Sequence, residues 1–183
     1  MKAASRLAAD ARGLRLLVVR ASFNTHVVDG LFAGAARALT EGGLAEGALR
    51  VVEVPGAFEL PLAAATAAAS GHFDALIALG AVIRGDTDHY EHIAREAAAG
   101  LAAVARETGV PVAFGVLTVQ DEAQALARSA PGPDNKGAEA ARAAVAMVHV
   151  LRALKRATEP RRTRRMSRET TTSRRRLSRG RKA

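Results

Sequence analysis

The stretch ALIALGAVIRGDTDHY, residues 75–90, decides the fold. Its first part, 75–79, is a short and wholly apolar run, which is typical of a strand buried on both faces of a parallel sheet. The following residues, 80–90, bring glycine, threonine and acidic side chains and lead into a helix predicted from His89 onward. A buried strand, a loop and then a helix form the repeating unit of an α/β fold.

The same unit recurs on both sides of this stretch. Apolar runs predict four strands, at 14–19, 49–54, 75–79 and 112–117. Longer alanine-rich segments predict five helices, at 28–41, 60–70, 89–108, 121–128 and 138–156. Right-handed crossovers then place helices on both faces of the sheet. The expected fold is a three-layer αβα sandwich around a four-stranded parallel sheet, of the flavodoxin-like type.

The charge is distributed unevenly along the chain. The net charge is +9, but residues 160–183 hold 11 Lys and Arg against the single acid Glu169, which leaves 16 bases and 17 acids in residues 1–159. The expected organisation is an arm at 1–13, a catalytic domain at 14–158 and a basic, disordered tail at 159–183. Binding of nucleic acid would then involve the tail alone, and we do not expect it to be the main function.

The composition excludes several function classes. Without cysteine, the chain has no disulfide framework, thiolate nucleophile or Cys-based zinc site. Its apolar runs are far shorter than the roughly 18 residues of a membrane span. Charged residues from Lys2 to Arg12 interrupt the N-terminus, which does not match a secretory signal. We therefore expect no membrane partner and a cytoplasmic location.

The loops that follow the strands should gather at one edge of the sheet and bind a ligand there. In the first loop, Phe23 could stack on a planar heterocycle or pack in the core. In the second, Glu59 could accept hydrogen bonds from ligand hydroxyls or complement a helix dipole. The third loop ends at a helix N-terminus, which suits an anion, but on its own it is also explained by an ordinary turn capped by Thr87 or Asp88.

Three further side chains have chemistry that suits such a site. His89 is the general acid or base candidate of the loops, because histidine changes protonation near neutrality. Arg128 and Lys136 could reach a phosphate or a carbonyl oxygen, or could be solvated surface charges. A metal site of His89 with His92 and Asp88 is conceivable, but a convergent set of further ligands is not visible.

Five blocks occur in an order that resembles the lumazine synthase family over about residues 14–155. They are Phe23-Asn24, VPGAFELP (54–61), ALGAVIRGDTDHY (78–90), GVPVAFGVLT (109–118) and NKGAEAA (135–141). The resemblance implies an enzyme of riboflavin biosynthesis that condenses 5-amino-6-(D-ribitylamino)uracil with 3,4-dihydroxy-2-butanone 4-phosphate. The products would be 6,7-dimethyl-8-ribityllumazine, phosphate and water. It implies no metal and no redox cofactor.

The resemblance also implies roles for individual residues. The uracil and its ribityl chain would be held by seven residues of the first three loops: Phe23, Ala57, Phe58, Glu59, Ala81, Val82 and Ile83. Asp86, Thr87 and Arg128 would bind the phosphate ketone. His89 would shuttle protons, and Phe114 and Lys136 would close the pocket.

The resemblance further implies that the sites lie between the subunits of a pentamer or a multiple of it. The Arg-rich tail has no counterpart in the family pattern. The alternative function is a non-catalytic module that binds a flavin or a lumazine with the same loops and does not turn over the two substrates.

Overall fold

The structure, a computed structural model, describes residues 10–158. It contains four strands, β1 (Leu16–Ala21), β2 (Leu49–Val54), β3 (Ala75–Ile83) and β4 (Val112–Val119). Five α-helices alternate with them, α1 (Thr25–Glu41), α2 (Leu60–Ala69), α3 (His89–Thr108), α4 (Glu122–Ser129) and α5 (Lys136–Thr158). A short 3-10 helix, η1 (Ala57–Glu59), precedes α2. The predicted basic tail and most of the predicted N-terminal arm lie outside the described residues.

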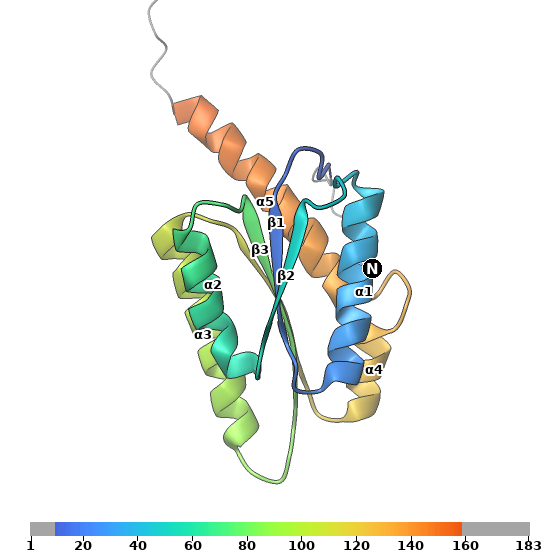
Figure 1. The fold of residues 1–183 in the computed structure, drawn as a ribbon. Coiled ribbons are helices and arrows are strands. Elements are labelled where there is room, and N and C mark those ends of the chain that lie inside the picture. The colour runs from blue at the N-terminus through green and yellow to red at the C-terminus, as the bar shows by residue number, and fades with distance from the viewer. Residues whose placement is uncertain (1–9, 159–183) are drawn as a thin grey trace, which may run out of the picture.

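The four strands form one parallel sheet in the order β2-β1-β3-β4, with helices on both faces (Figure 1). Helices α1, α4 and α5 cover one face, and α2 and α3 cover the other. Successive residues of β3 serve the two cores alternately, as a strand requires: Ile77 packs toward α1 and α5, and Leu76 packs toward α2 and α3. The predicted three-layer αβα sandwich is confirmed.

Three strands run further than predicted, because pairing continues past the apolar runs. β3 extends to Ile83, which pairs with Val119 of β4, so residues 80–83 are strand and not loop. β1 continues through Arg20, whose charge lies between Asp29 of α1 and Glu53 of β2. A paired charge can enter a strand where an unpaired one would break it.

Burial on both faces, which the apolar runs at 49–54 and 112–117 also predict, is wrong for β2 and incomplete for β4, where Phe114 and Thr118 are exposed. Every residue of β2 is at least partly accessible in the single chain, whereas every residue of β1 is buried. β2 lies at one edge of the sheet and β4 at the other, and periodicity in the sequence does not distinguish edge strands from central ones.

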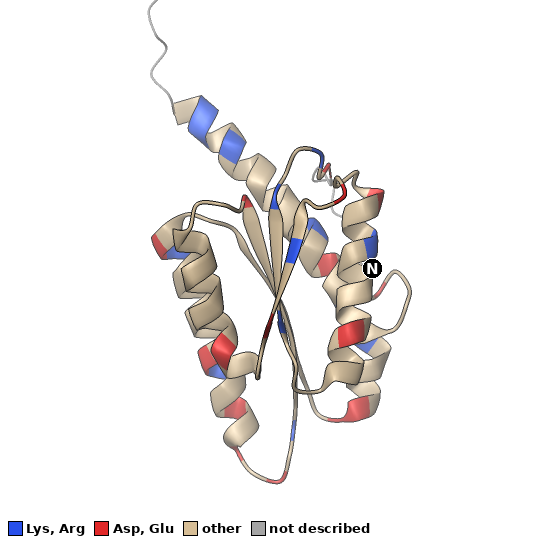
Figure 2. Cartoon of the chain, viewed as in Figure 1, with Lys and Arg blue, Asp and Glu red and all other residues tan. Residues whose placement is uncertain are grey.

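Acidic and basic residues are interspersed along α1, α3, α4 and α5, α2 has none, and basic residues gather in the last turns of α5 (Figure 2). The near-neutral body predicted from the sequence is therefore also mixed in its surface charge. No helix within residues 10–158 is long and apolar enough to span a membrane.

Candidate functional site

The loops after β1 and β2 and the end of β3 are joined to one another at the carboxyl edge of the sheet, the lower end in Figure 1. The N–H of Ser22 donates to the Val54 carbonyl at 2.8 Å, and the N–H of Phe23 donates to the Pro55 carbonyl at 3.0 Å. The side-chain amide of Asn24 donates to the Ala81 carbonyl at 3.0 Å. Residues from three distant parts of the sequence thus form one continuous surface, as predicted.

Two aromatic rings on this surface face solvent. The side chain of Phe23 is 70% exposed and that of Phe58 is 56% exposed. Core packing, one of the two interpretations of Phe23, is therefore wrong for the single chain. Exposed rings in a chain with only 3% aromatic residues are available to stack on a planar ligand or to pack against another subunit.

Glu59 ends η1 and occupies the N-cap position of α2, but its side chain makes no capping hydrogen bond. The carboxylate instead turns back over the Pro55-Gly56 turn: a Cβ on Gly56 would lie 3.2 Å from Glu59 Oε2. Ala57, between them, is buried. A half-buried carboxylate that caps no helix suits the role of accepting hydrogen bonds from ligand hydroxyls.

The backbone of Ala81, Val82 and Ile83 belongs to the end of β3 and extends past the end of β1. The N–H of Arg84 donates to the Val119 carbonyl of β4 at 3.0 Å, so even-numbered backbone groups here face β4. Ala81 and Ile83 consequently face the opposite side, where β1 has already ended at Ala21. Backbone donors and acceptors of β3 are thus presented toward the Phe23 loop.

The loop 84–88 leads into α3 and carries the candidate anion-binding and proton-transfer groups. Arg84 anchors it, because its Nη1 donates to Gln120 Oε1 at 3.1 Å and its guanidinium lies 5.6 Å from the centre of the Tyr90 ring. Asp86, Thr87 and His89 are exposed, and His89 is the first residue of α3. Asp88 occupies the N-cap position of α3, as one of the two interpretations of this loop expected, but its side chain makes no capping bond.

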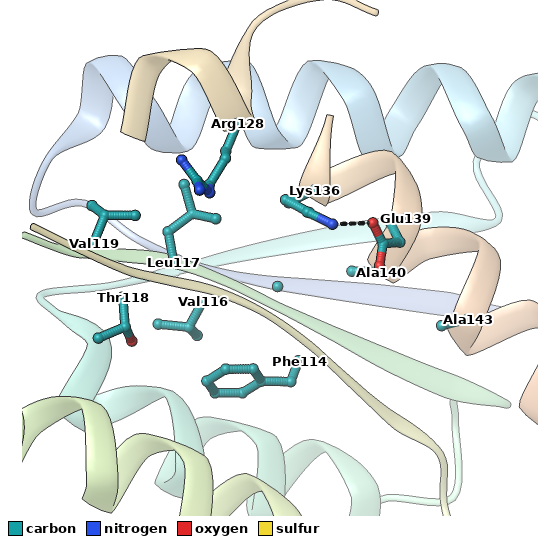
Figure 3. Close-up of a pocket in the computed structure, with 11 residues that line it drawn as sticks. Phe114, Val116, Leu117, Thr118, Val119, Arg128, Lys136, Glu139, Ala140 and Ala143 are labelled. Atoms are coloured by element: carbon teal, nitrogen blue, oxygen red, sulfur yellow. Dashed lines mark hydrogen bonds and ion pairs between the residues drawn. The ribbon is translucent and has the colours of Figure 1, made fainter. Parts of the chain in front are cut away.

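A second group of predicted site residues lies along β4, around a hollow of about 260 Å³ (Figure 3). Phe114, 46% exposed, projects from one side of β4, and Arg128 of α4 and Lys136 of α5 lie on the other side. Arg128 Nη1 donates to the Gln124 carbonyl at 2.9 Å, and Lys136 is ion-paired with Glu139. Two cations and one aromatic ring therefore project at the free edge of the sheet.

Asn135 holds the helix ends that carry the two cations, and residue-type reasoning assigned it no role. It is 1% exposed, and its Nδ2 donates to the carbonyls of Gly30, Ser129 and Ala130 at 3.0, 2.6 and 3.1 Å. Its Oδ1 accepts from the N–H of Ala138 at 3.0 Å and so caps α5. One amide thereby ties together α1, the end of α4 and the start of α5.

The structure does not bring the two groups together within one chain. The hollow at β4 is lined by Phe114, Arg128 and Lys136, but by neither Phe23 nor His89. The carboxyl-edge group is defined as Phe23, residues 57–59, residues 81–83 and residues 86–89. Ala57, Ala81 and Val82 in it are buried, and its two aromatic rings and residues 86–89 are exposed. The β4-edge group is defined as Phe114, Arg128 and Lys136 and lies at the end strand of the sheet, with Phe114 and Arg128 exposed.

A second hollow, lined by Asp10, Arg12, Glu41 and Arg142 among others, carries no comparable chemistry. Hydrogen bonds from the side chain and backbone of Arg12 hold the pKa of Asp10 well below its usual range. Arg142 likewise faces Glu41 at 3.9 Å. Within residues 10–158, no group of three or more His, Asp and Glu side chains is placed to hold a metal ion.

An αβα sandwich whose aromatic, acidic and backbone groups gather at the carboxyl edge of a parallel sheet defines a ligand-binding protein of the α/β class. The sequence profile of 6,7-dimethyl-8-ribityllumazine synthase matches residues 13–152, and the chain belongs to this family. It is an enzyme of riboflavin biosynthesis, a transferase that forms 6,7-dimethyl-8-ribityllumazine. The matched segment covers both groups of site residues.

Proposed function

We propose that residues 14–158 form the catalytic unit, and that its active site is built by two copies of the chain. The carboxyl-edge group of one copy would face the β4-edge group of another. One observation carries this proposal: the hollow lined by the β4-edge group is lined by neither Phe23 nor His89, and both groups present exposed side chains. Contacts between unlike surfaces repeat around a ring, which is consistent with a pentamer or a multiple of it.

The carboxyl-edge group would bind 5-amino-6-(D-ribitylamino)uracil. The exposed ring of Phe23 offers a flat apolar face for the pyrimidine, and the side of β3 that faces away from β4, at Ala81 and Ile83, offers backbone hydrogen-bonding groups to its polar edge. Glu59, whose carboxylate caps no helix, would accept hydrogen bonds from the ribityl hydroxyls. Ala57 and Phe58 would supply the walls between them.

The phosphate of 3,4-dihydroxy-2-butanone 4-phosphate would bind at the start of α3. Backbone N–H groups at Asp86 and Thr87 and the Thr87 hydroxyl are exposed where the helix dipole favours an anion. Arg128 of the neighbouring copy would add a charge-assisted bond. Phe114 and Lys136 would close the same pocket, and Lys136 would exchange its bond to Glu139 for one to the substrate.

The proposed reaction begins when the 5-amino nitrogen of the uracil attacks the ketone carbon and water leaves to give an imine. Loss of a proton from the neighbouring carbon then expels phosphate, and the resulting enol becomes a ketone. The ribityl-bearing nitrogen attacks this ketone, and loss of a second water closes the ring. His89, at the phosphate end of the site, would carry protons between these steps, and holding the two reactive substrates together would supply most of the acceleration.

The test is to incubate the purified chain with both substrates and to follow lumazine absorbance and released phosphate together. Equal formation of both products, well above the uncatalysed rate, is the expected result. Tight binding of lumazine without turnover would instead support the non-catalytic module. A His89→Ala variant in the same assay separates chemistry at the site from mere retention of the two substrates.

A further inference from the structure

We propose that Asn24 is a positioning residue that fixes the distance between the Phe23 ring and the β3 backbone at 81–83. The inference rests on the proposed function, because it concerns how the pyrimidine would be held between these two parts. Asn24 does not belong to either group of site residues defined above. Its role follows from its backbone conformation and from the hydrogen-bond partner of its side chain.

The backbone of Asn24 adopts a left-handed conformation, with φ 58° and ψ 42°. Among residues 10–158 it is the one residue other than glycine with a positive φ. Asparagine tolerates this region better than most residues, but the conformation is still uncommon and concentrates at functional sites. The turn it makes directs the chain from β1 into α1 immediately after Phe23.

The side chain of Asn24 is not used in the way its position suggests. Asn24 is the N-cap residue of α1, where an asparagine oxygen usually accepts from an N–H of the first helical turn. No such bond is formed. The amide instead crosses to β3 and donates from Nδ2 to the Ala81 carbonyl at 3.0 Å, in a half-buried position.

This side-chain bond replaces a backbone hydrogen bond between β1 and β3 that is not made. In the register of β1 with β3, where Arg20 pairs with Leu79, the next donor for the Ala81 carbonyl would be the N–H of Phe23. That N–H is turned toward β2 and donates to the Pro55 carbonyl at 3.0 Å. The Asn24 side chain therefore satisfies the Ala81 carbonyl while the chain turns and presents the Phe23 ring to solvent.

Because the Ala81 carbonyl already accepts a hydrogen bond from Asn24, the pyrimidine should bind this side of β3 mainly through the backbone of Ile83. Loss of the Asn24 amide would free the carbonyl and loosen the Phe23 loop relative to β3. Binding of the pyrimidine should suffer, and binding of the phosphate ketone, which involves a different loop, should not.

Two substitutions separate the backbone conformation from the hydrogen bond. Asn24→Gly keeps the left-handed conformation at no steric cost but removes the amide. Asn24→Asp keeps the shape and a residue that tolerates this region but replaces the donor with a carboxylate that faces a carbonyl. Thr25→Val is the matched control, because it removes a hydroxyl hydrogen bond within the same loop, to the Ser22 carbonyl, without touching β3.

Steady-state kinetics of the full chain, with each substrate varied in turn, provides the readout. Both Asn24 variants should raise KM for the aminouracil substrate about tenfold, the effect of losing one hydrogen bond. Their KM for the phosphate ketone should stay within about twofold of wild type, and Thr25→Val should leave both values unchanged.

Wild-type KM for the aminouracil in either Asn24 variant, or an equal rise for both substrates, would overturn the positioning role and leave the proposed function standing. A wild-type chain that does not turn over the two substrates would overturn both.

Discussion

Asn135 occupies the space into which any side chain at Gly34 would project: a Cβ on Gly34 would lie 1.9 Å from Asn135 Oδ1. A second close contact joins the same two segments, because a Cβ on Gly137 of α5 would lie 1.9 Å from the Leu31 carbonyl of α1. The close approach of α1 and α5 therefore requires glycine at both positions, because a side chain at Gly34 would overlap Asn135 and one at Gly137 would overlap the backbone of Leu31. This contact sets where α5 begins, and hence where Lys136 projects at the β4 edge.

Gly34→Ala should lower the free energy of unfolding by about 2 kcal/mol, because the new methyl group must displace a buried and fully bonded amide. Alanine has the higher helix propensity, so any loss reports on this contact alone. Chemical denaturation measures the change. Ala33→Ser, on the exposed side of the same helix, should alter stability by no more than about 0.5 kcal/mol; a similar loss in both variants would contradict the steric explanation.

Phe23→Ala should raise KM for the aminouracil substrate about tenfold, because one face of the pyrimidine loses its aromatic partner. The thermal unfolding midpoint should hardly change, since the ring is 70% exposed and contributes little to the core. Phe23→Trp, which keeps a flat aromatic face, serves as the control and should retain most of the affinity. Wild-type affinity in Phe23→Ala would refute the stacking role.

Arg128→Ala should raise KM for the phosphate ketone by about ten- to a hundredfold, because a charge-assisted hydrogen bond to phosphate is lost. Arg128→Lys should recover part of the affinity through its charge, without the forked geometry of the guanidinium. KM for the aminouracil provides the internal control and should stay constant. If both values rose together, the substitution would be disturbing the subunit contact and not the phosphate.

His89→Ala should lower kcat by about a hundredfold, at the lower end of what a general acid or base contributes. The reason for a modest loss is that proximity of two reactive substrates would remain intact in this variant. The measurement is kcat at saturating concentrations of both substrates. Equal kcat in the two proteins would remove His89 from the mechanism.

Mixed oligomers offer a direct test of a site shared by two copies. A Phe23→Ala/His89→Ala double variant damages the carboxyl-edge group, and Arg128→Ala damages the β4-edge group. At substrate concentrations well below the raised KM values each variant alone should be strongly impaired, but random co-assembly in equal amounts should restore about one quarter of the wild-type sites, where two intact groups meet. Activity no greater than the sum of the separate variants would place the whole site within one chain.

The residue pattern alone predicted the order and type of every described α-helix and strand, but not the 3-10 helix η1. Buried apolar runs and glycine-bounded helical segments are local properties, so 49–54 and 89–108 were predicted with their observed bounds. The strand ends were less predictable. Arg20 continues β1 only because Asp29 and Glu53 pair with its charge, and neither neighbour is local in sequence.

The sequence by itself determined the α/β fold and the chemistry of its loops, because hydrophobic periodicity and residue type are properties of short stretches of sequence. Only the tertiary structure decided which strands lie at the edges of the sheet, and that Phe114, Arg128 and Lys136 line a hollow at β4 that neither Phe23 nor His89 lines. It also decided what Asn24 and Asn135 do. A side-chain amide can serve as a helix cap, a turn residue or a bridge, and its long-range hydrogen-bond partners exist only once distant segments have packed together.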